Sequence, residues 1–316
     1  MADLPVSMAD RVRILSDALP YIQSFQGKTF IVRYGGDAMN DPALMNAFAR
    51  DVALLRLVGM HPVVVHGPGP QVDELLRSLG ITAEFHQGVR ITDEKTLRVI
   101  EMVLGEHNQE IVGLINQHGG RAVGLNGQDA HFIHARKLEP PAGQAQGGSV
   151  DLGFVGDVER IDADLVEHLI ASGYIPVIMP IGVGPGGEAY HIEADLVAAR
   201  LAQTLRAEKL LMLTNAPGVI DAQGRILNNI RAADLERLSE DGTARGGMLP
   251  KLGAALHAVR NGVRSVHVVD GRVPDALLLE VLTSEGIGTT ILPDEAPRFL
   301  ADSRRYLGTG GAAIAD

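Results

Sequence analysis

The chain has 316 residues, of which 46% are hydrophobic and 21% charged, with a formal net charge of −11. This length allows one large or two modest domains, and the negative charge argues against general nucleic-acid binding, which needs a basic surface. The absence of cysteine excludes disulfides, thiolate nucleophiles and cysteine-ligated zinc. No apolar run reaches the roughly 18 residues that a membrane span needs, so we expect a cytoplasmic protein without membrane or nucleic-acid partners.

The first predicted element is an amphipathic helix over residues 8–26. Apolar residues recur there at three- and four-residue spacing, and Pro20 is expected to kink the helix. Because the segment precedes the first strand and has little core of its own, two interpretations stay open. It is either a helix lying on the domain or an oligomerisation arm.

Strands and helices then alternate along the chain. The predicted strands are residues 29–32, 121–125, 131–137, 174–183, 208–221, 265–271 and 288–292, and residues 61–70 are a buried strand that runs into a second glycine-rich turn. The predicted helices are residues 42–58, 71–79, 93–117, 162–173, 194–206, 251–261 and 274–284, and a Pro/Gly/Gln-rich loop covers 139–150. Repeated βα units predict an α/β three-layer sandwich, an open and mostly parallel sheet with helices on both faces. Ligands should bind at the carboxyl ends of its strands.

One strand end carries groups suited to binding an anion. The strand from Thr29 leads into Arg33 and the pair Gly35-Gly36, and a helical pattern follows from Pro42. A strand, a glycine turn and a helix can point backbone N–H groups at an anion, and Arg33 adds a cation. Glycine also serves βα turns that only need a positive φ. The stretch is therefore a candidate phosphate or carboxylate site.

Several motifs occur together in the order and spacing of one family. They are RYGGDAM, VVVHGPGPQV, GVRIT, YHIEAD, LTNAPGV, GGMLPKL and VHVVDGRVPDALLLE. From about Pro20 to Leu292 the chain resembles the N-acetylglutamate kinases of the amino acid kinase superfamily. The resemblance implies the amino acid kinase fold and a phosphotransferase that uses ATP and Mg²⁺. Its acceptor would be the side-chain carboxylate of N-acetylglutamate or a related acidic acylamino acid.

The same resemblance implies a domain organisation and partners. Residues 1–26 would be an oligomerisation helix, residues 27–204 the lobe for the acidic substrate, and residues 205–316 the lobe for the nucleotide. The segments PYIQSFQGKTF and EGIGTTIL are similar to the arginine-sensitive, hexameric branch of the family. They imply a homo-oligomer, dimer or hexamer, and an arginine or other amino-acid effector near Glu285 and Gly288.

The resemblance also assigns residue roles in a reaction that depends on positioning and charge neutralisation. Lys251 matches a phosphate-binding lysine, although a lysine near a helix start is also an ordinary solvated residue. Asp195 matches the aspartate that organises the cations, and Arg90 matches the arginine that grips the substrate's α-carboxylate. The remaining matches are phosphate- and substrate-loop residues Gly35, Gly36, Gly67, Pro68 and Gly69, and nucleotide-lobe residues Asn215, Gly218 and Gly247.

Several matched positions depart from the family pattern. Arg33 replaces the first catalytic lysine, and Pro68 replaces a glycine whose N–H should face the phosphoryl group. Losing one such donor typically raises a barrier by about 2.7–4 kcal/mol. The other replacements are Asp37, His191 and Glu193 for asparagines, Gln128 for a lysine and Asn215 for an aspartate. Together they make the site about two charge units more negative, which predicts a retained fold with altered chemistry.

Three hypotheses about function follow. The first is a kinase with a divergent site, in which Arg33, Lys251 and Asp195 handle the phosphoryl group. The second is a hydrolase, lyase or cyclase that reuses the acidic-substrate pocket. There the alternating residues His191, Glu193 and Asp195 would share one side of an extended segment, joined by Asp37 and His66. They would act as acid–base groups or as ligands of an unknown divalent metal. The third is a catalytically silent regulatory paralogue.

Overall fold

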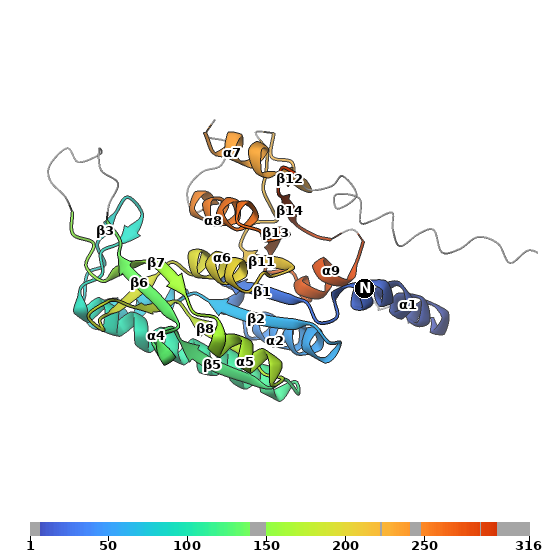
Figure 1. Cartoon of the computed structure of the whole chain (residues 1–316), viewed down its shortest axis with the longest axis horizontal. Coiled ribbons are helices and arrows are strands. Elements are labelled where there is room, and N and C mark those ends of the chain that lie inside the picture. Colours follow the sequence, from blue (N-terminus) through green and yellow to red (C-terminus); the bar gives the residue numbers. More distant parts are fainter. Residues whose placement is uncertain (1–6, 140–149, 222, 241–247, 285, 296–316) are drawn as a thin grey trace, which may run out of the picture.

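The computed structural model describes residues 7–139, 150–221, 223–240, 248–284 and 286–295. Most of the predicted loop at 139–150 lies outside these ranges, as do Gly247 and Glu285. The described chain folds into a three-layer α/β sandwich (Figure 1). This confirms the fold class that the alternation of strands and helices predicts.

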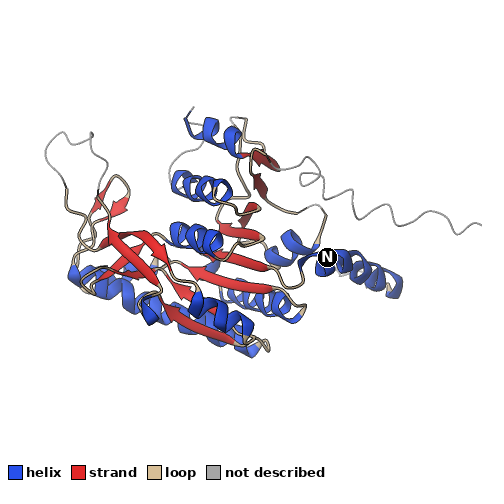
Figure 2. Ribbon diagram, viewed as in Figure 1, coloured by secondary structure: helices blue, strands red, loops and turns tan. Residues whose placement is uncertain are grey.

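The central sheet has eight strands in the order β12-β14-β13-β11-β1-β2-β8-β5. Figure 2 shows the strands in red with the helices in blue around them. The bounds of these strands are β1 Thr29–Tyr34, β2 His61–His66, β5 Ala122–Asn126, β8 Ile175–Met179, β11 Lys209–Thr214, β12 Asn229–Arg231, β13 Ser265–Asp270 and β14 Thr289–Leu292. Neighbouring strands run parallel except for β14, which pairs antiparallel to β13. Strands β1, β2 and β11 are buried from their second residue onward because helices cover both faces of the sheet.

Helices cover the two faces of the sheet in separate groups. One face is packed by α5 Asp164–Ala171, α6 Ala194–Thr204, α7 Ala232–Glu240 and α8 Met248–Arg260. The other is packed by α2 Pro42–Leu57, α4 Glu94–Gln117 and α9 Ala276–Leu282. Asp41 and Asp93 start α2 and α4 by accepting backbone N–H bonds with their side chains, as expected of good N-caps. Each face therefore has its own buried apolar cluster.

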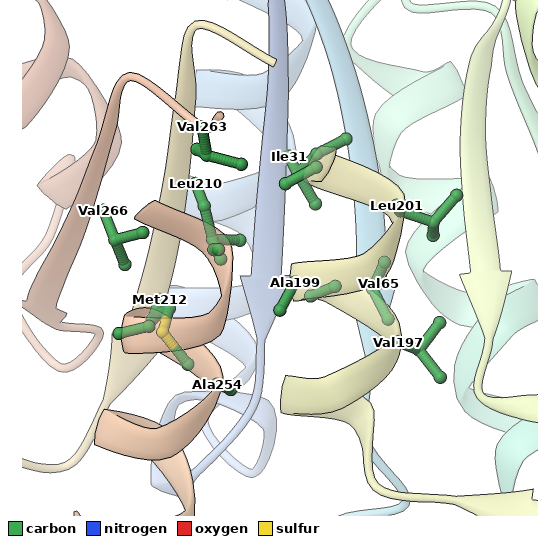
Figure 3. Close-up of a cluster of buried hydrophobic side chains, with 14 of the residues drawn as sticks. Ile31, Val65, Val197, Ala199, Leu201, Leu210, Met212, Ala254, Val263 and Val266 are labelled. Atoms are coloured by element: carbon green, nitrogen blue, oxygen red, sulfur yellow. The ribbon is translucent and has the colours of Figure 1, made fainter. Parts of the chain in front are cut away.

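The packing of α6 fixes the position of the strand ends that carry charged residues. Val197 and Leu201 of α6 are fully buried with Ile31 of β1 and Val65 of β2 (Figure 3). Close packing of this kind leaves few alternative positions for a helix. The first turn of α6, which contains Asp195, is thereby held near the carboxyl ends of β1 and β2.

A second, smaller group of strands was only partly predicted. Strands β6 Ile133–Lys137, β7 Val155–Ile161, β9 Ile181–Val183 and β10 Ala189–Ile192 close into a small barrel, and β3 Phe85–His86 pairs with β4 Val89–Arg90. The prediction of one strand over 174–183 is wrong. The chain leaves the central sheet after Met179, and Pro180, which has no N–H to donate, separates β8 from β9. The predicted strand 208–221 likewise ends early, at Thr214.

Helix α1 Met8–Phe25 is continuous through Pro20. Its end is attached to the sheet by Phe25, whose ring meets Phe30 edge-on at 5.4 Å, while most of the helix projects away from the domain (Figure 1). Among the described helices, none is long and apolar enough to cross a membrane. The short helix α3 Gln71–Ser78 follows the second glycine-rich turn.

Candidate functional site

Arg33 lies where β1 ends, and its guanidinium group fills the space between two glycine turns. A Cβ atom on Gly35 would stand only 1.9 Å from Arg33 Nη1, and one on Gly67 would stand 3.6 Å from Nη2. Glycine at position 35 is therefore required for this arginine to fold back over its own turn. The arginine is 8% exposed, so the cation is largely desolvated at the predicted phosphate site.

Asp195 joins Arg33 to Lys251. Its Oδ1 lies 2.6 Å from Arg33 Nε, and its Oδ2 accepts a hydrogen bond from Lys251 Nζ at 2.7 Å. The contact with Arg33 is a close ion pair that is not aligned as a hydrogen bond. Asp195 is 1% exposed, whereas the Lys251 side chain is 21% exposed. The structure thus brings together three of the predicted catalytic residues, from β1, α6 and α8.

Glu193 borders this cluster. It is the N-cap residue of α6, is exposed to solvent, and makes no side-chain capping bond. Desolvation of its carboxylate and then the negative charge of Asp195 raise its pKa, and the charges of Arg33 and Lys251 offset part of this rise. Glu193 is therefore easier to protonate than an ordinary glutamate.

Arg90 and His191 form a second group. Arg90 Nη2 donates to Asp73 Oδ1 at 2.6 Å, and its guanidinium lies 4.6 Å from the centre of the Phe85 ring. Its Nη1 is buried without a hydrogen-bond partner among the described residues. Burial and the charge of Arg90 lower the pKa of His191 to about 4. A neutral imidazole beside a guanidinium with an unused N–H suits a carboxylate ligand.

The turn at residues 67–70 connects the two groups. Gly67 packs at Arg33, and Asp73, in the first turn of α3, binds Arg90. Behind the turn, His66 is fully buried, with Nδ1 3.2 Å from the Gly67 carbonyl and Nε2 3.1 Å from the Asn108 amide. Burial lowers the pKa of His66 to about 4. His66 therefore supports the turn and does not face the site.

Asn215 and Gly218, which were predicted to lie in the nucleotide lobe, make contacts that stabilise the turns around them. Asn215 follows β11, and its Oδ1 accepts the backbone N–H of Asp37 at 2.8 Å, closing the first glycine turn. Gly36 has a φ of 84°, and a Cβ there would meet Asn215 Oδ1 at 2.2 Å. A Cβ on Gly218 would meet Thr289 Oγ1 at 2.6 Å, so that glycine allows close packing against β14. Asp37 itself is exposed.

The expectation that His191, Glu193 and Asp195 share one side of an extended segment is wrong. Only His191 lies on strand β10, while Glu193 caps α6 and Asp195 belongs to its first turn. Gln128 lies elsewhere, in the turn after β5, where it bonds Asn126. The described residues include no group of three or more His, Cys, Asp or Glu side chains that could hold a metal. The metal version of the second hypothesis therefore has no site in the described chain.

Sequence reasoning missed a second buried charged cluster, at the opposite ends of the strands. His267 Nδ1 lies 2.6 Å from Glu280 Oε1, and His267 Nε2 lies 2.9 Å from Ser265 Oγ. Glu280 Oε2 also accepts the backbone N–H groups of Ile287 and Gly288, and burial lowers the pKa of the nearby Lys209. Polar residues inside an otherwise apolar strand, as in SVHVVD, were the signal that could have revealed it.

The fold and the cluster of cations at glycine turns are those of a phosphoryl-transfer enzyme. The chain belongs to the amino acid kinase family, whose sequence profile matches residues 28–270. It is therefore a phosphotransferase. Two acetylglutamate kinases are similar over most of their length. The one from Chromobacterium violaceum is 57% identical over 284 residues, 90% of this chain and 98% of that protein. The one from Aromatoleum aromaticum is 54% identical over 292 residues, 92% of this chain and 97% of that protein.

Solved structures agree with this family. An N-acetylglutamate synthase from Neisseria gonorrhoeae, complexed with coenzyme A and N-acetylglutamate, has a TM-score of 0.78 and 27% identity. The match covers 89% of this chain and 63% of the synthase, so the chain spans less than two thirds of that protein. A carbamate kinase from Giardia lamblia bound to citric acid has a TM-score of 0.60 at 18% identity, covering 85% and 99% of the two chains. That likeness concerns the fold alone.

Proposed function

We propose that this chain transfers the γ-phosphoryl group of ATP to the side-chain carboxylate of N-acetylglutamate. The observation that carries the proposal is the cluster of Arg33, Asp195 and Lys251 at the glycine turns. It occurs in a chain more than half identical to acetylglutamate kinases over nearly their whole length. The hydrolytic alternative needs His191 and Glu193 to act together, whereas the charged neighbour of His191 is Arg90.

Each residue has a distinct task in the proposed reaction. Arg33 and Lys251 neutralise the phosphoryl oxygens, and Asp195 holds both cations in place. Backbone N–H groups of the turn at Gly35 and Gly36 supply further donors. Chemistry of this kind depends on positioning and on charge stabilisation, because the phosphoryl group passes through a loose transition state. The acceptor is the side-chain carboxylate of the substrate, which attacks in line. The α-carboxylate at the other end of the substrate holds the molecule in place.

Arg90 is the residue proposed to bind the α-carboxylate of the substrate. Its Nη2 is committed to Asp73, which fixes the guanidinium, and its Nη1 is buried without a partner among the described residues. A buried N–H without a partner costs about 1–3 kcal/mol, and an acidic ligand removes that cost. His191, with its pKa lowered to about 4, can add a neutral N–H donor at the same carboxylate.

The nucleotide belongs, in this proposal, to the lobe after residue 205, beside the turn that contains Asn215 and Gly218. Mg²⁺ would arrive bound to the ATP phosphates, because the described residues form no metal site of their own. The divalent ion supplies charge neutralisation between the phosphates when ATP is bound. A cytoplasmic location follows as part of the proposal, since ATP is the phosphoryl donor.

The proposal extends to an amino-acid effector and to self-association. A synthase of similar fold has been solved with L-arginine, and the cluster of Lys209, His267 and Glu280 lies next to the end of α1, since Lys209 Nζ is 5.0 Å from the Phe25 ring. Helix α1 exposes large apolar residues, including Met8 at 78% and Leu15 at 72%. A homo-oligomer built through α1 would cover them.

The experiment is a coupled assay of ADP release with MgATP, with and without N-acetylglutamate and with and without arginine. We expect ADP release that depends on the acceptor, and trapping of the acyl phosphate by hydroxylamine separates it from simple ATP hydrolysis. Asp195→Asn, which removes the charge that orders both cations, serves as the inactive control. A native chain that binds nucleotide but forms no hydroxamate would contradict the proposal and leave the regulatory hypothesis.

A further inference from the structure

The turn at residues 67–70 keeps one backbone donor for a ligand. Its sequence is Gly-Pro-Gly-Pro, and the two prolines have no N–H. The Gly67 N–H is already used, since it donates to the Tyr34 carbonyl at 3.2 Å. The Gly69 N–H has no hydrogen-bond partner among the described residues. What this turn can donate to a phosphoryl oxygen therefore depends on the orientation of Gly69.

The backbone at Gly69 can change its orientation unless a neighbouring group restrains it. Its φ of 62° lies in the left-handed region, which glycine enters and leaves at little cost. The side chain of Gln71 supplies the restraint, because a Cβ atom on Gly69 would stand only 2.2 Å from Gln71 Oε1. The Gln71 amide thus packs against the backbone of the one residue whose N–H is free.

Gln71 is held in this place by the end of the first glycine turn. Its Nε2 donates to Asn40 Oδ1 at 2.6 Å, whereas its Oε1 is buried without a hydrogen-bond partner among the described residues. Asn40 is itself fixed, because it ends the short 3-10 helix η1 Asp37–Met39 and donates its backbone N–H to the Asp37 carbonyl at 2.9 Å. The bond to Asn40 therefore keeps the Gln71 amide against Gly69.

The two glycine turns are thus connected in two different ways. The guanidinium of Arg33 lies between Gly35 of the first turn and Gly67 of the second, and the amide pair of Asn40 and Gln71 joins the residues that follow the turns. Arg33 brings a charge to the site. The amide pair is neutral, so what it can contribute is the relative position of the two turns.

We propose that Asn40 and Gln71 form a strap that fixes the distance between the two glycine turns and aims the Gly69 N–H at the phosphoryl group. Both are positioning residues, because they act through Gly69. The inference rests on the proposed function in so far as a phosphoryl group is the ligand. A preorganised donor acts mainly on charge that develops in the transition state. Loss of the strap should therefore lower kcat and leave KM almost unchanged.

The experiment compares native protein with Gln71→Met, Asn40→Ala and the double variant. Methionine keeps nearly the length and shape of glutamine but cannot donate to Asn40. Asn46→Ala is the matched control, because it removes an exposed amide whose bond, to His118 Nε2 at 2.9 Å, involves neither turn.

Two quantities are measured for each protein. Hydroxamate formation from MgATP and N-acetylglutamate gives kcat and the two KM values. Hydrogen–deuterium exchange, followed by mass spectrometry without ligand, reports on the peptides that contain residues 34–40 and 66–72. The exchange measurement does not depend on catalysis, and the melting temperature of each variant shows that it is folded.

We expect each single variant to lower kcat by about ten- to a hundredfold, the effect of a donor misplaced by about 1 Å. Both KM values should stay within about twofold of native. The double variant should be no slower than the single variants, because each change breaks the same bond. Exchange should become faster in both peptides in all three variants, and Asn46→Ala should behave as native in both measurements.

Native rates in the single variants, losses that multiply in the double variant, or a lower kcat without faster exchange would each overturn the inference while the proposed kinase stands. If native protein forms no hydroxamate, the proposed function fails and the exchange measurement decides on the strap alone. Faster exchange in both peptides would then support the strap, and unchanged exchange would overturn it.

Discussion

Two clusters of buried charge lie at opposite ends of the same parallel strands. Asp195 holds Arg33 and Lys251 at the carboxyl ends, and Glu280 holds His267 near the amino ends, beside Lys209. Their composition is similar, since in each a carboxylate lies between nitrogen-containing side chains. Their surroundings differ. The cluster at Asp195 is open to a ligand, whereas the cluster at Glu280 is closed and stabilises the fold.

The closed cluster is completed by backbone. Glu280 accepts N–H groups of Ile287 and Gly288 in addition to His267, so its oxygens are fully used. The open cluster is bordered instead by glycine turns, and its lysine remains partly exposed. A buried charge that backbone N–H groups satisfy adds to stability, whereas charges left partly exposed for a ligand are kept at some cost in stability.

The largest predicted effect concerns the open cluster. Lys251→Ala removes a cation that neutralises the transferring phosphoryl group, and ADP release should fall by about a hundred- to a thousandfold. The melting temperature should change little, because Asp195 keeps its contact with Arg33. Lys28→Ala, at an exposed position between α1 and β1, is the control and should keep the native rate. A loss of less than tenfold would mean that Lys251 is only a solvated helix residue.

The closed cluster should show the opposite pattern. Glu280→Gln leaves His267 and Lys209 without a buried anion and should lower the free energy of unfolding by about 2–3 kcal/mol at neutral pH. Basal activity should change much less than in Lys251→Ala. Thermal unfolding followed by circular dichroism measures the effect, and an unchanged melting temperature would refute the structural role of this cluster.

The same cluster predicts how stability depends on pH. Burial raises the pKa of Glu280, but its hydrogen bond with His267 and other contacts outweigh this and lower the pKa below the ordinary 4.5. Burial also lowers the pKa of His267 to about 4 from 6.5. In both cases the unfolded chain binds protons that the native chain does not, so the stabilisation is present above about pH 6.5 and lost as the pH falls towards 4. The difference between native and Glu280→Gln should shrink below pH 4.5.

The same contrast explains what the sequence could predict. The order of the strands and helices could be predicted because buried parallel strands are rich in apolar residues and because glycine turns mark their ends, as at Gly35 and Gly67. The prediction that Arg33, Asp195 and Lys251 lie together is confirmed. Their catalytic roles stay predictions.

The errors lie where tertiary contacts override local pattern. The strand predicted over 174–183 breaks at Pro180, and its second half pairs with a small barrel that has no strong apolar signature. Period-2 alternation suggested a shared face for His191 and Asp195, but a helix begins between them. The cluster around Glu280 joins residues from separate elements, and its local trace was the pair of polar residues Ser265 and His267 in an apolar strand.

The smallest predicted effect tests why the open cluster tolerates Pro68. The turn there packs against Arg33 through Gly67, and proline offers no N–H to the phosphoryl group. If that donor limits the reaction, Pro68→Gly should raise the rate of ADP release by about tenfold, part of what such a donor is worth elsewhere. Because glycine gives the unfolded chain more conformational freedom than proline, the substitution should lower the free energy of unfolding by about 0.4–1 kcal/mol. Pro274→Gly, exposed before α9, should show that stability loss without any gain in rate. A folded Pro68→Gly protein with the native rate would mean that the missing donor does not limit the reaction, because Arg33, which lies against Gly67 of the same turn, already supplies it.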